Sequence, residues 1–330
     1  MVGVHSVDPL HWVLLIAPAV IMIVVNGIVG SVSYLLVHRL RPVSRPVELC
    51  LQLAIGGIMC TIVPEKITQL MGLREMLHHY SVGCLAAINF FRYAEIAFDT
   101  APRGVTHSLL PFLAFVSLPG GEIMFSKDAK VVKCPPGTVA RRVWGAFVSG
   151  LGVTVSLSIL ELLQGTSART LDLSLVPLTL SEMLRSLSLR QLAVNYFTCC
   201  LYAGMLSVMC QLGAGVFALV LGYDTEDPMR SPMVYSQGVN DFWGRRWNRT
   251  VHKFLKRLFF DPTFNATRIR WLATLAAFSA SATFHELLVH HMVRKAPPHL
   301  RLGVEGRQGY QVAFFVSQAV LCYAERSLDR

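Results

Sequence analysis

The sequence has little charge for its length and no paired cysteines. Only 15% of its 330 residues are charged and 53% are hydrophobic, whereas soluble domains carry about 25% charged residues. The eight cysteines form no CxxC pair, and most lie within apolar stretches. This pattern is typical of small core residues and argues against disulfides and zinc ligands. The composition therefore disfavours an ordinary soluble domain.

Several catalytic motifs are also missing. The chain has neither a GxSxG nucleophile elbow nor a GxxxxGK[ST] phosphate loop, so serine hydrolases and P-loop ATPases lose support. His285 and Glu286 begin like an HExxH zinc motif, but position 289 is valine and His290 comes one residue too late. We therefore expect no metal site.

The basic residues indicate a membrane surface. The net charge is +10, but the lysines and arginines lie between long apolar runs instead of forming a polar domain. Basic loops beside a bilayer explain this distribution better than nucleic acid, which we do not expect as a partner. The first apolar run lacks a preceding basic segment and is too long for a signal peptide, so we expect an uncleaved span.

Long apolar runs predict the fold. A membrane helix needs about 20 apolar residues to cross roughly 30 Å of hydrocarbon. Five runs are long enough: residues 10–37, 47–63, 143–163, 192–221 and 271–292. Two others, residues 105–118 and 312–322, are short, and Arg92 and Glu95 interrupt residues 81–98, where charge is costly in a bilayer. We predict an all-α, multi-pass transmembrane protein with about seven or eight spans, in one membrane-embedded domain covering residues 1–330.

Loop charges predict the sidedness. The positive-inside rule places the basic segments after the first span, before residue 143 and within residues 222–270 in the cytoplasm. This works if residues 105–118 cross the membrane while residues 81–98 lie at the interface or re-enter. The N-terminus is then lumenal. The basic residues after position 292 would also be lumenal, against the rule.

A basic amphipathic helix is predicted near residue 250. Its apolar positions recur at spacings of three and four, so they form one stripe that suits a membrane interface: Val251, Phe254, Leu255, Leu258 and Phe259. Asn248 extends this apolar face. Its amide is either a buried functional group or a helix N-cap or local packing amide. Trp243 and Trp247 are explained equally well as interfacial anchors.

His285 lies well inside the run that starts at Trp271. Ionisable residues at membrane depth are expensive and usually functional, and the small residues at 276–282 would let a neighbouring helix approach. The alternative is a histidine that only packs against another helix. Glu286 and His290, four residues apart, would pair across one helical turn. A transporter could also use His285 and Glu286 along its path, but it would need paired broken helices that the sequence does not show.

Two segments carry a family resemblance. The block Asp-Phe-Trp-Gly-Arg-Arg-Trp-Asn, residues 241–248, precedes a membrane helix with His-Glu-Leu-Leu at 285–288. The chain thus resembles the wax synthase branch of the membrane-bound O-acyltransferases, with the motifs concentrated in residues 222–330. The likeness is greatest to fungal members that acetylate terpenoid or meroterpenoid alcohols in secondary metabolism. Family members continue through further membrane helices after the histidine-bearing one, whereas this chain ends at Arg330, so we expect a differently built tunnel or an incomplete variant.

The resemblance implies acyl transfer from acyl-CoA, acetyl-CoA by preference, to a lipophilic alcohol. Asn248 and His285 would be the functional pair. A histidine near its ordinary pKa of about 6.5 suits a general base, and an amide can stabilise the oxyanion or orient the base. The alternatives are wax ester synthesis from long-chain alcohols, a transporter-like protein and an inert scaffold.

The donor would be a co-substrate, with no bound cofactor. Its phosphates could be gathered by six basic residues: Arg245, Arg246, Arg249, Lys253, Lys256 and Arg257. The alternative for these residues is a stripe that binds anionic lipid. We expect a multi-pass protein of the endoplasmic reticulum membrane, and the sequence leaves the oligomeric state open.

Overall fold

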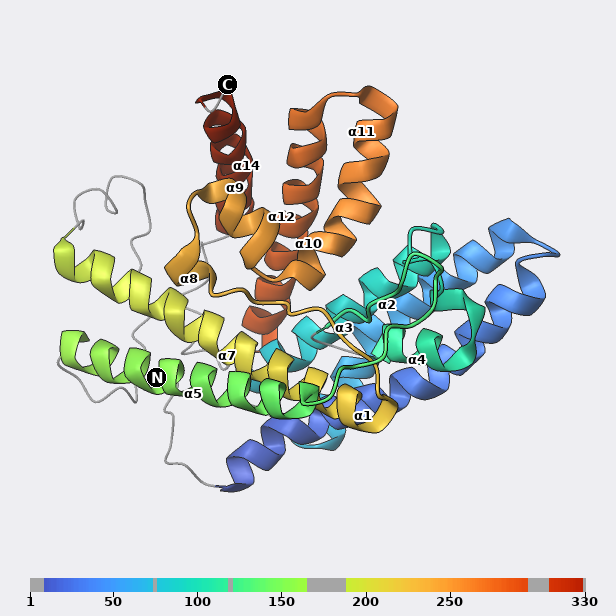
Figure 1. The fold of residues 1–330 in the computed structure, drawn as a ribbon, viewed down its shortest axis with the longest axis horizontal. Coiled ribbons are helices and arrows are strands. Elements are labelled where there is room, and N and C mark those ends of the chain that lie inside the picture. The colour runs from blue at the N-terminus through green and yellow to red at the C-terminus, as the bar shows by residue number, and fades with distance from the viewer. Residues whose placement is uncertain (1–8, 74–75, 118–120, 165–187, 296–308, 329–330) are drawn as a thin grey trace.

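The predicted all-α architecture is confirmed. The computed structural model describes residues 9–73, 76–117, 121–164, 188–295 and 309–328 (Figure 1). Over these ranges the chain forms helices and no strands, with three isolated β-bridges between loop residues. Apolar runs that satisfy their own backbone hydrogen bonds account for this, because helices are the form that such runs adopt in lipid.

The N-terminal half consists mainly of long helices. In chain order they are α1 (Pro9–Leu35) with a π turn η1 (Leu36–Leu40), α2 (Arg45–Leu70), α3 (Met76–Ala97), a 3-10 turn η2 (Val105–His107), α4 (Leu109–Ser117), α5 (Thr138–Gln164) and α7 (Leu189–Leu221). α5 and α7 run side by side, and α2 packs along α3 (Figure 1).

The C-terminal part begins with short elements and ends with two long helices. They are α8 (Pro232–Tyr235), α9 (Val239–Asp241), a π turn η4 (Phe242–Arg246), α10 (Arg249–Leu255), a π turn η5 (Lys256–Phe260), α11 (Asp261–Thr267), α12 (Arg270–Lys295) and α14 (Tyr310–Leu328). α11, α12 and α14 stand together, with α10 at their base (Figure 1).

Five helices are long and apolar enough to cross a membrane. They are Val20–Leu40, Arg45–Leu70, Thr138–Leu163, Leu189–Leu221 and Arg270–His290, which match the five long runs predicted from the sequence. Their large apolar side chains point outward, as at Ile28 and Leu219, which are 66% and 72% exposed. A lipid environment explains this exposure, and the chain is an integral membrane protein. The total of seven or eight crossings remains a prediction.

The prediction that residues 105–118 cross the membrane is wrong for the described part of that run. α4 has nine residues, which span about 14 Å at 1.5 Å per residue, about half of the hydrocarbon thickness. Phe112, Phe115 and Val116 are buried instead. At Gly30 of α1 an added Cβ would lie 2.9 Å from Val116 Cγ2, so α1 and α4 pack closely. The run is apolar because it belongs to the protein core.

α3 keeps its two charges inside the protein. Arg92 and Glu95 are both fully buried, so neither side chain meets lipid. α3 also packs closely against α2, where a Cβ added at Gly56 would lie 3.1 Å from Tyr93 Cβ. Burial among partners removes the cost that made this run ambiguous in the sequence.

The cysteines are free, as their spacing predicts, but they are not all core residues. All eight carry free thiols, and only Cys210 and Cys322 are buried. Cys50 and Cys199 are exposed on α2 and α7, two of the candidate spans. Small apolar residues are accepted on a lipid-facing surface as readily as in a core. Hydropathy alone therefore does not distinguish the two positions.

Two loops, one before α5 and one after α7, run beside each other. The segment before α5 pairs with the segment after α7 through bridges Ile123↔Thr225 and Lys133↔Tyr223. The backbone N–H of Glu226 also donates to the carbonyl of Glu122 at 2.9 Å. This pairing brings two glutamates from distant parts of the chain together beneath α10.

Candidate functional site

The predicted amphipathic helix is confirmed, and its apolar stripe packs against protein. Phe254 of α10 is buried and stacks on Phe91 of α3, with ring centroids 4.4 Å apart and planes 12° apart. Phe259 of η5 and Phe284 of α12 also meet the Phe91 ring edge to face, with ring centroids 6.3 and 5.7 Å apart. The stripe therefore fastens this segment to α3 and α12. The π turn Lys256–Phe260, which interrupts it, was not predicted by the spacing.

Asn248 is the N-cap of α10, as one of its two interpretations proposed. Its backbone is left-handed, with φ 34° and ψ 64°, a conformation that asparagine tolerates better than most residues. Its Oδ1 accepts a hydrogen bond from the Val251 N–H at 3.3 Å, and its own N–H points at Met229 Sδ at 3.2 Å. In the described residues the side-chain NH₂ has no hydrogen-bond partner and stays available to donate.

His285 faces protein, as the small residues before it predict. Its ring is half-buried on α12 and stacks on Phe315 of α14, at 4.6 Å with planes 27° apart. Phe284 lies edge to face with it at 5.5 Å. Ala282, one turn earlier, is buried, and the absence of a large side chain there lets α14 approach.

The block of residues 241–248, which contains Trp243 and Trp247, also contacts Phe315. Trp243 Nε1 donates to Gln318 Oε1 at 3.1 Å, and its ring lies 5.9 Å from Phe315. Trp247 lies 6.2 Å from Trp243. Rings thus connect the block ending at Asn248 to His285, although no contact among the described residues joins Asn248 to His285 directly.

The expected pair between Glu286 and His290 does not form in this structure. Glu286 Oε1 instead accepts a hydrogen bond from the Gly309 N–H at 2.8 Å, and its buried Oε2 has no hydrogen-bond partner among the residues that the structure describes. Glu286 therefore ties α12 to the start of α14. The spacing of four residues placed Glu286 and His290 on one helical face, but it could not show that Glu286 bonds to Gly309.

Five of the six predicted phosphate-binding cations are neutralised by carboxylates. The pairs are Arg246 with Asp241 at 2.5 Å, Arg249 with Glu226 at 2.5 Å, Lys253 with Glu226 at 2.5 Å and Glu122 at 3.4 Å, Lys256 with Asp261 at 2.7 Å, and Arg257 with Glu95 and with Glu122, the last at 2.9 Å. Arg245 is exposed and has no ion pair within the part of the chain that the structure describes. Donor binding by these residues stays a prediction.

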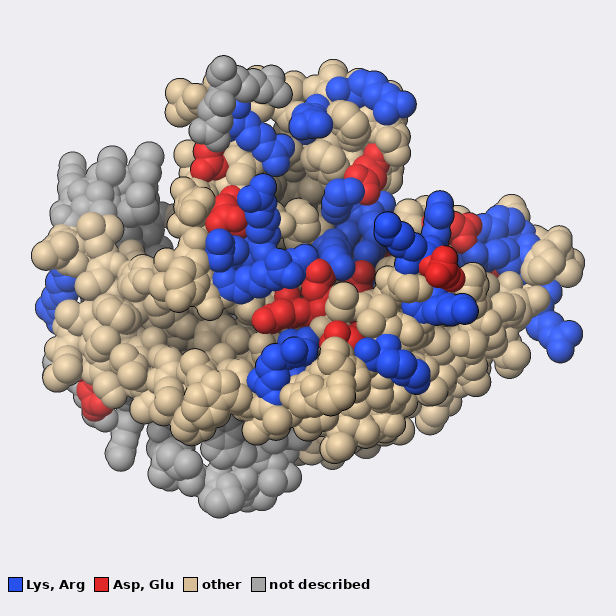
Figure 2. Space-filling model, in the orientation of Figure 1, with Lys and Arg blue, Asp and Glu red and all other residues tan. Residues whose placement is uncertain are grey.

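A buried charge cluster anchors α10 and η5 to α3. We define it by its five side chains: Arg92, Glu95, Glu122, Lys253 and Arg257. Arg257 binds Glu122 with two parallel hydrogen bonds of 2.9 Å, the geometry in which arginine and carboxylate interact most strongly. Arg92 reaches Glu122 at 3.4 Å and lies 4.3 Å above the Phe115 ring. Acidic side chains gather at the middle of one face of the molecule, bordered by basic ones (Figure 2).

The cluster keeps Glu122 ionised. Burial raises its pKa, but Arg257, Arg92 and Lys253 outweigh burial and lower the pKa to about 2. One feature of the sequence pointed to this cluster: charges interrupt residues 81–98, and a buried charge needs a partner. It gave no signal that the partner is Glu122 or Arg257.

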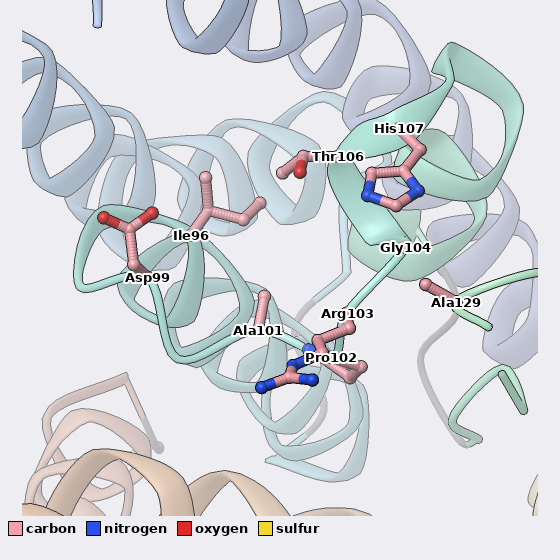
Figure 3. A pocket seen from close by; sticks show the side chains of 9 residues that line it. All are labelled: Ile96, Asp99, Ala101, Pro102, Arg103, Gly104, Thr106, His107 and Ala129. Atoms are coloured by element: carbon pink, nitrogen blue, oxygen red, sulfur yellow. The ribbon is translucent and has the colours of Figure 1, made fainter. Parts of the chain in front are cut away.

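Two cavities lie beside the loops and away from His285. One, of about 280 Å³, has Asp99 and His107 at its border (Figure 3). The other, of about 380 Å³, is lined by Glu122, Lys253 and Arg103 among others and borders the buried charge cluster. Neither is lined by Asn248 or His285.

The segment with both motifs is similar to known acyltransferases. The model of the membrane-bound O-acyltransferase family matches residues 169–314. Two relatives from Arabidopsis thaliana, probable long-chain-alcohol O-fatty-acyltransferases 9 and 3, are 30% and 29% identical over 25% and 28% of this chain. A diacylglycerol O-acyltransferase 1 from Chlorocebus aethiops is 44% identical over 16% of this chain and 11% of its own length.

The similarity is local. The matches cover 26% and 29% of the two Arabidopsis proteins, so the chain spans little more than a quarter of the length of these relatives. They support the resemblance to wax synthase-like acyltransferases, while the narrower likeness to fungal acetylating members remains a prediction. Over residues 169–314, which hold Asn248 and His285, this membrane protein is similar to the membrane-bound O-acyltransferases.

Proposed function

We propose that the chain is an acyl-CoA-dependent O-acyltransferase that esterifies a lipophilic alcohol. The observation that carries this proposal is the position of His285. Its imidazole lies on a candidate membrane span, stacks on Phe315, and shares that contact with Trp243 of the block that ends at Asn248. Both segments fall within the match to an acyltransferase family.

His285 acts as the general base in this proposal. The alcohol oxygen attacks the thioester carbonyl carbon while its proton passes to the imidazole. Collapse of the tetrahedral intermediate breaks the carbon–sulfur bond, and the departing thiolate takes the proton back. The ester and free coenzyme A leave, and His285 returns to its starting state. No acyl-enzyme is needed, because the thiolate is already a good leaving group.

Asn248 supplies a hydrogen-bond donor. Its Oδ1 is used by the cap on Val251, so the side-chain NH₂ is the group that can face the developing oxyanion or orient the base. The cap gives this NH₂ a defined direction, because the side chain is fixed at its other end.

The acceptor is an alcohol that partitions into the bilayer. A base on an apolar helix is reached at lower cost by a lipophilic molecule, since a polar acceptor loses hydration on the way in. The acyl chain separates two versions of the proposal. The resemblance predicts acetyl-CoA with a terpenoid or meroterpenoid alcohol, whereas the printed names of the Arabidopsis relatives favour a fatty acyl donor and a long-chain alcohol.

The donor approaches from the cytoplasm, where acyl-CoA is made, at an endoplasmic reticulum membrane. Arg245 and Lys256 are the exposed cations of the six. Lys256 pairs with Asp261, whereas Arg245 has no ion pair among the described residues and would attract the phosphates first. Arg249 and Lys253 already share Glu226, so phosphates would have to compete with that carboxylate for them.

The proposal is tested with membranes that contain the wild-type chain or a variant. Each receives a polycyclic terpenoid alcohol or a long-chain fatty alcohol, together with acetyl-CoA or palmitoyl-CoA, and mass spectrometry follows the ester. We expect ester in the wild type, none with His285→Ala, and normal amounts with His290→Ala, an exposed histidine on the same helix. Ester formation that survives in His285→Ala contradicts the mechanism. Predominant palmitoyl transfer to the fatty alcohol selects wax ester synthesis over acetylation.

A further inference from the structure

One face of α14 contacts residues 238–247, which include most of the block that ends at Asn248. Phe315, Gln318, Cys322 and Glu325 recur at spacings of three and four, which places them on one side of a helix. Each of them contacts the segment from residue 238 to residue 247. The opposite side of α14 is exposed, with Val320 at 60% and Tyr323 at 54%.

Glu325 holds the start of this segment. Its carboxylate accepts hydrogen bonds from the backbone N–H groups of Val239 and Asn240 at 3.1 and 2.7 Å, and from Asn240 Nδ2 at 2.6 Å. The same Nδ2 also lies 2.9 Å from the Cys322 carbonyl. Hydrogen bonds to an ionised acceptor are about twice as strong as neutral ones. The carboxylate therefore caps a three-residue helix, α9, from a different part of the chain.

The fit around Glu325 leaves no space at Gly238. A Cβ added there would overlap Glu325 Oε1. The backbone of Gly238 is extended, so the glycine is required by the approach of the carboxylate and not by a left-handed turn. Loop and helix are thus matched in shape as well as in hydrogen bonds.

Gln318 and Phe315 continue the contact toward His285. Gln318 accepts the indole N–H of Trp243, and Phe315 touches Trp243 on one side and His285 on the other. Between α8 and α10 the chain has only a three-residue helix and a π turn. Such short elements do not hold their own geometry, so their position is set by the helix they contact.

We infer that Glu325 and Gln318 are positioning residues, and that through them α14 fixes the segment ending at Asn248 relative to His285. We call the contacts of α14 with residues 238–247 the clamp. This inference rests on the proposed function, because it assigns the clamp to the same acyl transfer. It adds two residues and one helix to a pair that the sequence places in α12 and before α10. Loss of the clamp should leave substrates able to bind but misalign the donor amide and the base, and small misplacements of this kind slow chemistry strongly.

The test uses the full-length protein in membranes or detergent. Glu325→Gln keeps the length of the side chain but turns one acceptor into a donor, and Gln318→Ala removes the acceptor for Trp243. We expect each to lower kcat by about tenfold, the loss typical of one hydrogen bond to a charged or buried group, with KM for acyl-CoA and for the alcohol within about twofold. Gly238→Ala, which displaces Glu325 from the other side, should behave like Glu325→Gln. The matched controls are Arg326→Gln, exposed on the same helix, and Gln311→Ala, two turns before Gln318.

A second measurement does not depend on activity. Hydrogen exchange of a peptide containing Val239 and Asn240 should be faster by about tenfold in Glu325→Gln than in the wild type or Arg326→Gln, because the carboxylate that protects both N–H groups is weakened. Full kcat, or an equal loss in the controls, overturns the inference. A loss of folded protein with unchanged kcat per folded molecule overturns it as well, since the role would then be structural only. If exchange in Glu325→Gln equals that of the wild type, Glu325 does not protect these N–H groups and the clamp does not exist. If Glu325→Gln speeds exchange but the wild type transfers no acyl group, the proposed function is contradicted and the clamp stands.

Discussion

The buried charge cluster and the ring contacts around His285 lie on two sides of the same short segment, yet they are built from opposite materials. The cluster joins Arg257, Glu122 and their partners through ion pairs with little solvent exposure. The other side joins Trp243, Phe315 and His285 through ring contacts and one indole hydrogen bond. The basic residues of the segment 245–257 therefore serve mainly to hold it in place, while its aromatic residues connect it to His285.

Substitutions in the ion pairs and in the ring contacts should have different effects. Removing one partner of a buried ion pair leaves an uncompensated charge and costs about 3–5 kcal/mol. An aromatic pair contributes only about 0.5–1.5 kcal/mol beyond its burial. Substitutions in the cluster should therefore appear first as lost stability, and substitutions on the ring side as lost activity in a folded protein.

The largest effect is expected at His285. His285→Ala should lower kcat by a factor of about 100 to 10,000, the contribution typical of a positioned general base. Its stability should change little, because the ring is only half-buried and an apolar side chain suits the helix. Initial rates and the apparent unfolding temperature in detergent measure both quantities. A variant that loses stability and activity in parallel would show that His285, like the buried charge cluster, has a structural role.

Arg257 should show the reverse behaviour. Arg257→Met leaves Glu122 and Glu95 without their strongest partner, so we expect the free energy of unfolding to fall by about 3–5 kcal/mol. Arg245→Met is the matched control, since Arg245 is exposed and should change stability by less than about 0.5 kcal/mol. Thermal unfolding in detergent compares the two. An equal shift in both variants would mean that burial of the cluster adds nothing.

Asn248 lies between the two regions, and substitutions can separate its capping oxygen from its side-chain NH₂ group. Asn248→Asp keeps an oxygen that caps Val251 but removes the NH₂ group, so stability should hold while turnover falls by a factor of about 100 or more. Asn248→Gly removes the cap but relieves the left-handed backbone, so we expect it to lower the free energy of unfolding by only about 0.3 kcal/mol. Full turnover in the aspartate variant, measured by ester formation, would leave Asn248 with the cap alone.

The smallest effect is a pH dependence from His252. Burial lowers its pKa from the usual 6.5, and Lys256, Arg249 and Lys253 lower it further, while Glu226 opposes them. The unfolded chain therefore binds this proton more readily than the folded one. Stability that is present above pH 6.5 should be lost as pH falls through that value. Unfolding temperatures between pH 5 and 8 should show this slope, and His252→Gln should flatten it. An unchanged slope would assign the pH dependence to other groups.

Local patterns predicted the parts of the fold that depend on neighbouring residues. Hydropathy located five long helices, and spacing placed Val251 on one stripe with Phe254, which is buried against Phe91. The same measure failed for residues 105–118, because an apolar run buried in a core and one that crosses lipid have the same composition. Partners could not be predicted at all. Glu122 and Arg257 are 135 residues apart, and Asn240 and Glu325 are 85 apart, so only the tertiary fold brings them together.

The candidate site divides in the same way. His285 and Asn248 stand out in the sequence because a polar group in an apolar stretch is costly, and this signal is local. Gln318 and Glu325 give no such signal, since polar residues near the end of a helix are ordinary. Their role depends on Trp243 and Asn240 arriving beside α14, which no periodicity encodes.

The separation within the buried charge cluster also bears on how the protein is made. Glu95 and Glu122 emerge from the ribosome 162 and 135 residues before Arg257. At about 5–20 residues per second, Glu122 waits roughly 7 to 27 seconds for its main cation. During that interval Glu95 of α3 has Arg92 of the same helix as a partner, but Glu122 lacks the arginine that binds both of its oxygens. Burying a carboxylate without its partner is costly, so we expect this part of the core to close only after α10 and η5 have been synthesised.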